Sequence, residues 1–299
     1  MEKNKKLILA AIDIGSNAVR LLICEVINKG KNAEFNKLNL LRIPVRLGFD
    51  VFEKGHIGSQ KKKMLINTIK AFNNLMKVYE VDHYIACATS AMRDAENAKE
   101  IIKEIKSETS IEIEVITGEL EAEIIYENHI AELLDNDKSY LYIDVGGGST
   151  ELTLYNKSNI ILQKSFNIGT VRILTKKVKD ETWDDMKETL KELSKKYENI
   201  IGIGSGGNIN KLFSICGAKA GKSISYETLK DIYKEMESLS IVERMKKYTI
   251  KEDRAEVIVP ALTIYNAICK WSDISEIHVP KIGLADGLIQ HLYDKLMHD

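Results

Sequence analysis

One short pattern occurs twice in this chain, and it restricts the possible folds more than any other feature. Residues 9–22 read LAAIDIGSNAVRLL, and residues 141–152 read LYIDVGGGSTEL. Each stretch begins as an apolar run typical of a buried strand, passes through an aspartate into a turn with glycine and a hydroxyl, and returns to apolar residues. A chain that repeats this order at Asp13 and Asp144 is expected to contain two similar α/β units.

The bulk properties are compatible with two such units. The chain has 299 residues, with 43 Lys and Arg against 44 Asp and Glu, so its net charge is −1. This balance argues against a protein that coats nucleic acid, and no apolar run approaches the ~18 residues of a membrane-spanning helix. We therefore expect no nucleic-acid or membrane partner. Its four cysteines lack metal-binding spacing and are expected to be reduced thiols of a cytoplasmic protein: Cys24, Cys87, Cys216 and Cys269.

The pattern of apolar residues predicts an alternation of strands and helices in the first half. Strands are expected at 7–12, 19–27, 38–47, 84–88 and 111–116, and helices at 61–79, 92–106 and 119–134. A polar break at 134–139, LDNDKS, is the expected domain boundary. It divides the chain into domains at 1–134 and 135–283.

The second half starts the same pattern again. Strands are expected at 140–145, 150–155, 160–166 and 276–279, and NIIGIGSGGN at 199–208 reads as a further strand that enters a glycine loop. Helices are expected in the Lys-rich stretch up to Tyr197, from Lys211 to Trp271 and from Leu284 onward. GIGSGG at 202–207 also matches a dinucleotide-binding motif between a strand and a helix, but no clear second strand follows, so the βαβ unit that this motif requires is missing. GKS at 221–223 resembles part of a phosphate loop, but it follows a helix rather than a strand, and Gly217 lies one residue too close to it.

The repeated turns have the chemistry of a phosphate site. Glycines let the backbone present consecutive N–H groups to an anion, and hydroxyls add donors. An aspartate repels phosphate, but it can hold a divalent cation that contacts phosphate oxygens. An ordinary hairpin turn is the alternative for the first copy. The second copy has three glycines, two hydroxyls and Glu151, which is more than a turn requires.

The two loops resemble the phosphate loops of the actin-like ATPase superfamily, and the whole chain resembles its exopolyphosphatase/guanosine pentaphosphate phosphatase (Ppx/GppA) family in a short, two-domain form. The segments that carry the resemblance are ATSAMRDAEN at 88–97, VITGELEAEIIY at 115–126, SFNIGTVRI at 165–173, GSGGNINKL at 204–212, DRAEVIVPA at 253–261 and KIGLADGL at 281–288. The resemblance implies two ribonuclease-H-like domains of α/β class with the active site in the cleft between them. It also implies that the final helix, 284–299, packs back on the first domain.

The family pattern implies a role for individual residues. Glu121 would activate water, although an acid in the first turn of a helix is also explained by the helix dipole. Arg93 would bind phosphate, with a surface arginine as the alternative, and Arg20, Arg46 and Arg172 are open candidates for the cleft. Asp144, Glu151 and Asp13 would hold Mg²⁺ or another divalent cation. The remaining phosphate-binding residues would be Gly15, Ser16, Asn17, Gly146, Gly147, Gly148, Ser149 and Thr150.

The function implied is that of a Mg²⁺-dependent exopolyphosphatase, which releases terminal orthophosphate from inorganic polyphosphate by attack of water. The nearest alternative is removal of the 5′ terminal phosphate of guanosine pentaphosphate (pppGpp). A kinase of the actin-like superfamily and a non-catalytic module that binds alarmones are further alternatives. A homodimer is also open. GLADG at 283–287 departs from the commoner Gly-Leu-Arg-Glu-Gly of the family, which bears on substrate preference.

Overall fold

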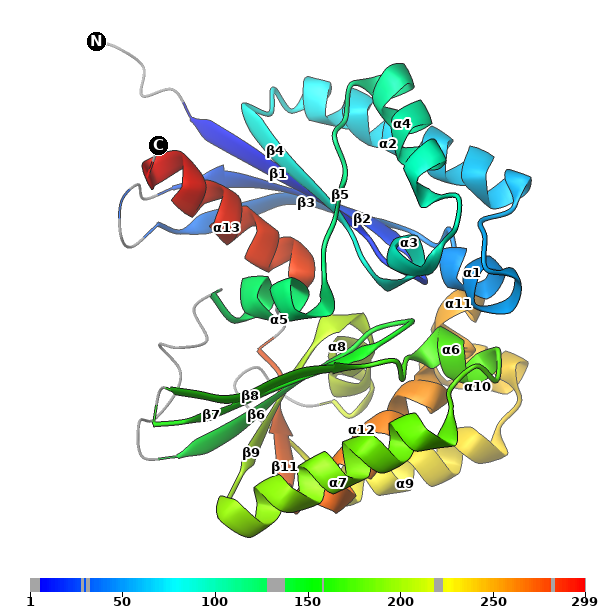
Figure 1. Ribbon diagram of the computed structural model, residues 1–299, viewed down its shortest axis with the longest axis vertical. Helices are drawn as coiled ribbons and strands as arrows, with labels where there is room; N and C mark the ends of the chain where they lie inside the picture. The colour runs from blue at the N-terminus through cyan, green and yellow to red at the C-terminus, as the bar shows by residue number, and fades with distance from the viewer. Residues whose placement is uncertain are drawn as a thin grey trace. The chain divides into compact units, whose positions relative to one another are not determined.

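The computed structural model describes residues 6–27, 30, 33–127, 138–157, 159–217, 223–280 and 283–298. The chain divides into two compact units (Figure 1). Unit 1 comprises Met1–Asn128 and Leu284–Asp299, and unit 2 comprises His129–Gly283. The domain boundary expected at 134 lies outside the described residues.

Unit 1 is built on a five-stranded mixed sheet of order β3-β2-β1-β4-β5. The first three strands are antiparallel, and β4 and β5 continue the sheet parallel to β1. Six of the eight residues in each of β1 and β2 are buried, so both faces of the sheet are covered. The strands are β1 Leu7–Ile14, β2 Val19–Val26, β3 Phe35–Ile43, β4 His83–Ala88 and β5 Glu114–Val115. The helices are α1 Leu47–Lys54, α2 Ser59–Val78, α3 Ser90–Asp94, α4 Ala98–Thr109, α5 Gly118–Glu127 and α13 Leu284–His298.

Helix α13 comes from the far end of the sequence and completes unit 1 (red in Figure 1). It packs on α5 and on β1, β2 and β4. The Tyr293 ring meets the Phe35 ring edge-on at 5.5 Å, and Asp286 forms an ion pair with Lys37. Gly287 allows the closest approach, because a Cβ there would lie 2.3 Å from the carbonyl oxygen of Ile124.

Unit 2 is built on a six-stranded sheet of order β10-β11-β9-β6-β7-β8. Strands β6, β9 and β11 run parallel, whereas β7, β8 and β10 are antiparallel to their neighbours. The strands are β6 Ser139–Val145, β7 Thr150–Asn156, β8 Asn159–Phe166, β9 Ile201–Ser205, β10 Ser223–Ser225 and β11 Glu276–His278. The helices are α6 Thr170–Leu174, α7 Asp180–Lys196, α8 Gly206–Ile215, α9 Tyr226–Ser238, α10 Ile241–Tyr248, α11 Glu252–Ala255 and α12 Ile258–Ser272.

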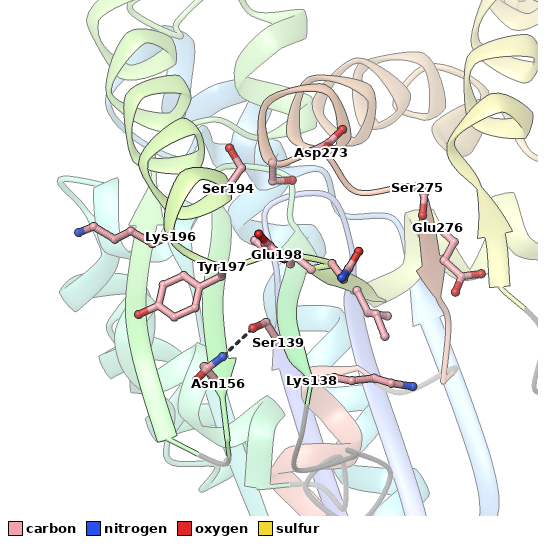
Figure 2. Close-up of a pocket in the computed structure, with 14 residues that line it drawn as sticks. Lys138, Ser139, Asn156, Ser194, Lys196, Tyr197, Glu198, Asp273, Ser275 and Glu276 are labelled. Carbon is pink, nitrogen blue, oxygen red and sulfur yellow. Dashed lines mark hydrogen bonds between the residues drawn. The ribbon is translucent and has the colours of Figure 1, made fainter.

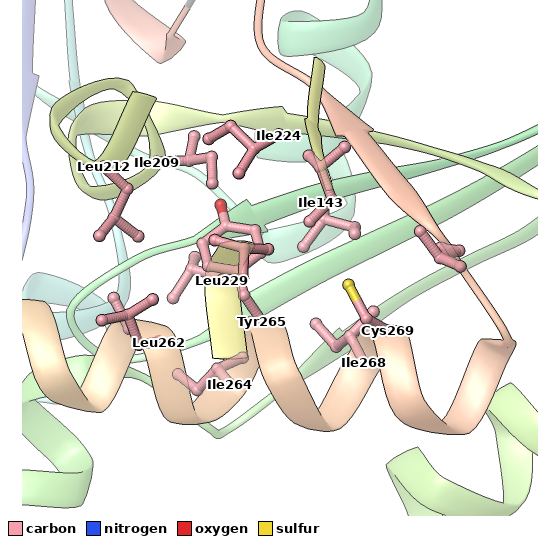
Figure 3. Packing of buried hydrophobic residues seen from close by; sticks show 14 of the residues in the cluster. Ile143, Ile209, Leu212, Ile224, Leu229, Leu262, Ile264, Tyr265, Ile268 and Cys269 are labelled. Atoms are coloured by element: carbon pink, nitrogen blue, oxygen red, sulfur yellow. The ribbon is translucent and has the colours of Figure 1, made fainter. Parts of the chain in front are cut away.

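The core of unit 2 lies between its sheet and α12. Figure 3 shows Tyr265, Ile268 and Cys269 of α12 gathered with Ile143 of β6 and Ile224 of β10. All five side chains are at most 2% exposed. Because side chains alternate along a strand, Asp144, next to Ile143, points to the opposite face of the sheet.

Several expected elements differ in the structure. The strand expected at 38–47 ends at Ile43, and α1 follows in a stretch for which no helix was expected. The helix expected at 92–106 is broken between α3 and α4, where the Asn97 side chain exchanges two hydrogen bonds with the Ile57 backbone. The strand expected at 111–116 pairs only at Glu114–Val115, beside Cys87 and Ala88.

The described residues also show the state of the four cysteines and whether a helix could cross a membrane. Cys24, Cys87 and Cys269 are buried free thiols, and Cys216 is a half-buried one. Within the described ranges, no helix combines the length and the apolar character needed to cross a bilayer.

Candidate functional site

The glycine loop of unit 2 connects β6 to β7 and faces its carbonyls toward α6. The Gly146 N–H closes the turn on the Ser149 carbonyl at 2.9 Å. The first two N–H groups of α6 donate to the carbonyls of the first two glycines at 3.1 and 2.8 Å, and Arg172 Nε donates to the third at 2.7 Å. Across the described part of the chain, no backbone carbonyl accepts from the N–H groups at 147–149. The loop therefore presents donors, as an anion site requires.

The loop at the end of β1 in unit 1 is built in the same way. The Gly15 N–H donates to the carbonyl three residues further on at 3.1 Å. The carbonyls of Ser16 and Asn17 accept from the Gly48 and Arg46 N–H groups at 2.8 and 3.0 Å, at the start of α1. In both units, backbone N–H groups at the start of a short helix further along the chain thus donate to the carbonyls of the loop.

Two of the expected site residues are already bonded within their own unit. Asp13 is only 3% exposed and forms an ion pair with Arg20, its register partner on β2, at 2.5 Å. A cation at Asp13 would have to compete with this guanidinium. The hydroxyl of Thr150 is fully buried and donates to the Ile168 carbonyl at 2.6 Å, which fixes the entry into β7.

Four polar side chains form a row across four neighbouring strands of unit 2. Asp144 on β6 is the register partner of Ser205 on β9 and of Glu151 on β7, and Glu151 is the register partner of Ser165 on β8. Register partners project from the same face of a sheet, so all four lie on one face. We call Ser205, Asp144, Glu151 and Ser165 the carboxylate row.

The two acids of the carboxylate row suit a metal ion. Asp144 is 8% exposed and Glu151 is 3% exposed, and a carboxylate oxygen of each lies within 4.8 Å of the other. Ser165 Oγ donates to Glu151 Oε1 at 3.0 Å. Two buried carboxylates this close repel each other, and a hard divalent cation with oxygen ligands would relieve that repulsion.

The turn after β9 restricts Asp144 from one side. Gly206 has a left-handed φ of 87°, and a Cβ at this position would lie 2.5 Å from Asp144 Oδ1. The turn is held by Arg254, which donates to the Gly207 carbonyl, and by Tyr265, which donates to the Ser205 carbonyl at 3.3 Å. Burial, and secondarily the charge of Asp144, raise the pKa of Tyr265 well above its ordinary value, so this hydroxyl stays a donor.

In unit 1, burial distinguishes Glu121 from its acidic neighbours. Glu121 is 8% exposed, whereas Glu119 and Glu123 on the same helix are exposed. Arg93 Nη1 lies 3.7 Å from Glu121 Oε2 and donates to the Ile116 carbonyl at 2.6 Å. An acid that only stabilised the helix dipole would not need to be buried, so the geometry favours a specific role for Glu121.

A polar cavity lies at the other end of the unit 2 sheet, where the parallel strands begin (Figure 2). Its volume is about 760 Å³. Ser139, at the start of β6, and Asn156, at the end of β7, line it and are hydrogen-bonded to each other at 2.7 Å. None of the residues of the carboxylate row lines this cavity, so it is separate from the candidate site.

The comparison with known families identifies the chain. The model of the Ppx/GppA phosphatase family matches residues 26–296. The chain belongs to the Ppx/GppA phosphatase family. Among solved structures, an exopolyphosphatase from Cytophaga hutchinsonii is 26% identical, with 96% of this chain and 98% of that chain covered and a TM-score of 0.81. The Ppx/GppA family member from Aquifex aeolicus is 27% identical, with 98% of both chains covered and a TM-score of 0.73.

Two curated relatives are much longer proteins. A bifunctional 3-dehydroquinate synthase/phosphatase from Fusobacterium nucleatum is 35% identical over 69% of this chain and 34% of its own length. A guanosine-5′-triphosphate,3′-diphosphate pyrophosphatase from Aliivibrio fischeri is 25% identical over 97% of this Ppx/GppA chain and 60% of its own length. The chain thus spans between about a third and three fifths of these relatives. The two α/β sheets match Ppx/GppA structures, which confirms the expected fold class of the actin-like superfamily.

Sequence reasoning missed three residues that shape the candidate site: Ser165, Ser205 and Gly206. Ser165 lay inside a segment that resembles the family, and Gly206 inside a glycine loop, but no spacing rule connects either to Asp144. Only the register of four strands brings Ser165 and Ser205 into one row with Asp144. Arg172, an open candidate, is found supporting the glycine loop through the Gly148 carbonyl.

Proposed function

We propose that this chain is a Mg²⁺-dependent exopolyphosphatase that removes terminal orthophosphate from inorganic polyphosphate. The observation that carries the proposal is the pair of buried carboxylates, Asp144 and Glu151, on either side of a loop that presents N–H donors. Membership of a phosphatase family and the similarity to a solved exopolyphosphatase support the same substrate class. We also propose that the protein acts in the cytoplasm, in keeping with its free thiols.

Asp144 and Glu151 would hold the metal ion directly or through water. Both are oxygen donors with buried negative charge, which fits Mg²⁺. When bound, the ion would supply positive charge to phosphate oxygens. Asp13 was expected to share this task, but its ion pair with Arg20 favours a supporting role in unit 1.

The other groups would bind the phosphate chain and accept one proton from the attacking water. The N–H groups at 147–149, and those of the matching loop at Ser16 and Asn17, would bind phosphate oxygens. Arg93 would offset charge on the phosphoryl group, and Glu121 would take a proton from the attacking water. The water oxygen bonds to the terminal phosphorus while the bridging P–O bond breaks, so orthophosphate leaves and the chain becomes one unit shorter. That both units act on one phosphate chain remains a prediction of the family resemblance.

Guanosine pentaphosphate is the second candidate substrate. It is supported by the pyrophosphatase from Aliivibrio fischeri, which matches 97% of this chain. Both substrates end in a phosphoanhydride, so the same groups would serve either one. The difference between them lies in the recognition of a nucleoside.

A substrate panel tests the proposal. Purified protein is given long polyphosphate, tripolyphosphate or guanosine pentaphosphate, each with Mg²⁺ or with EDTA, and orthophosphate release is measured. We expect Mg²⁺-dependent release, faster from the two polyphosphates than from guanosine pentaphosphate, with chains shortened from their ends. Faster release from guanosine pentaphosphate would select the second candidate. No release from any of the three, or random internal cleavage of polyphosphate, would refute the proposal.

A further inference from the structure

Ser165 stands at one end of the carboxylate row and contacts one of its acids. It lies on β8, the edge strand of the unit 2 sheet, directly across from Glu151. Its hydroxyl has one proton to donate, and that proton goes to Glu151 Oε1 at 3.0 Å. The contact joins two strands, so it is a feature of the fold rather than of a local turn.

The hydrogen bond fixes the orientation of a carboxylate that has little freedom otherwise. Glu151 is 3% exposed and cannot turn into solvent. With Oε1 held by Ser165, rotation about the last bond of the side chain is restricted, and the second oxygen keeps a constant direction. A carboxylate that is fixed in this way loses less entropy when it accepts a cation, and a hydrogen-bonded partner of a metal ligand typically sets its orientation.

We propose that Ser165 is a positioning residue that sets the affinity of the Asp144–Glu151 pair for a divalent cation. The inference rests on the proposed function, because it requires that this pair holds the metal. It goes further in assigning part of the metal affinity to a side chain that the cation does not touch. A serine that only filled space on β8 would leave metal binding unchanged when its hydroxyl was removed.

The test measures Mn²⁺ binding to the full chain by electron paramagnetic resonance and calorimetry, apart from any activity. Removal of a hydrogen-bonding partner of a metal ligand typically weakens metal affinity about 10- to 100-fold, and we expect Ser165→Ala to do so. Ser165→Thr retains the hydroxyl and suits a strand, so its affinity should stay within about threefold of the parent. Ser272→Ala is the matched control, because Ser272 is 2% exposed and donates only within α12, at the Ile268 carbonyl.

Turnover gives a second readout. With Ser165→Ala, the Mg²⁺ concentration for half-maximal rate should rise by the same factor as the Mn²⁺ dissociation constant. The rate at saturating Mg²⁺ should stay within a few-fold of the parent. If Ser165→Ala does not fold, Ser165→Cys replaces it, because a thiol keeps the size but is a weaker donor and should weaken binding by a smaller factor.

The outcomes separate this inference from the proposed function. If the parent itself binds no Mn²⁺, the metal site and thus the proposed function fail. If the parent binds Mn²⁺ and the folded variants that lack a strong donor at 165 bind it equally well, the inference about Ser165 alone is overturned. It is also overturned if these variants keep the parent's metal affinity but lose rate at saturating metal.

Discussion

Asp144→Asn should make the metal-free protein more stable while it abolishes metal binding. Asp144 and Glu151 are both less than a tenth exposed, and their nearest carboxylate oxygens are within 4.8 Å of each other. At an effective dielectric constant near 20, two unit charges at this separation repel by about 3.5 kcal/mol. The amide has almost the same shape as the acid and removes that repulsion. Part of the gain is offset because the amide has one acceptor oxygen where the carboxylate has two, so we expect about 2 kcal/mol of net stabilisation.

Thermal unfolding in EDTA and in Mg²⁺ measures this effect. For a unit of this size, about 2 kcal/mol corresponds to a Tm roughly 4–8 °C above that of the parent in EDTA. Saturating Mg²⁺ should stabilise the parent, by about 2.7 kcal/mol at 100 times its Kd, and should leave the variant unchanged. Asp273→Asn is the matched control. Asp273 is an exposed aspartate at the end of α12 with a left-handed φ of 55°, which asparagine also tolerates.

The control should change the free energy of unfolding by no more than a surface substitution does, about 0.5 kcal/mol or less, and should respond to Mg²⁺ as the parent does. The reasoning is refuted if Asp144→Asn is less stable than the parent in EDTA. It is also refuted if the variant gains as much from Mg²⁺ as the parent does, because the pair would then not be the metal site.

Three further predictions follow from residues in unit 1 and from the thiols. Glu121→Gln should lower turnover about 10²- to 10⁴-fold with polyphosphate binding nearly unchanged, as expected for loss of a general base. The turnover of Glu119→Gln, at an exposed position of the same helix, should stay within a few-fold of the parent. Equal effects of the two substitutions in a steady-state assay would contradict the assignment of Glu121. Burial alone would raise the pKa of Asp50, but hydrogen bonds from Lys61 and the Gly58 N–H lower it below its ordinary value. The carboxylate therefore stabilises the fold above its unfolded pKa of about 4 and loses this effect as pH falls through its folded pKa. Asp50→Asn should thus cost about 1 kcal/mol in urea unfolding at pH 7, and progressively less as the pH is lowered through that folded pKa. Burial raises the pKa of the Cys24, Cys87 and Cys269 thiols to about 12. At pH 8 these thiols should therefore react slowly with a thiol reagent in the native protein, whereas all four cysteines should react rapidly in urea-unfolded protein. Fast labelling of any of the three in the native protein would disprove their burial.

The strands around the repeated pattern were predictable from the sequence because their signal is local. Val145 and Thr150, which bracket the glycine loop, lie at the expected ends of β6 and β7. The helix α1 was not predictable, because it is short, has no side-chain cap and begins after a left-handed Arg46 that is stabilised by the loop at Asn17. Such a helix depends on a contact with a distant part of the sequence.

The same distinction applies to the candidate site. Asp144 and Glu151 lie on strands joined by a tight turn, so their proximity follows from the turn and the side-chain alternation. Ser205 and Ser165 reach the same row only through the pairing of β9 with β6 and of β8 with β7. For Ser205, more than fifty residues separate it from Asp144 in the sequence, and no pattern in one chain gives the register of that pair. The role of Gly206 also requires the position of the Asp144 side chain.

The return of α13 to unit 1 determines the order in which the protein can fold during synthesis. Unit 2 is continuous in sequence, whereas unit 1 needs α13, which packs against β1, β2 and α5. On the ribosome, the residues of unit 1 before Asn128 are made first but lack this helix until all of unit 2 has been translated. Unit 2 can therefore reach its native state first, while part of the apolar surface of the unit 1 sheet is still uncovered. During this interval the exposed apolar surface would be the main binding site for chaperones.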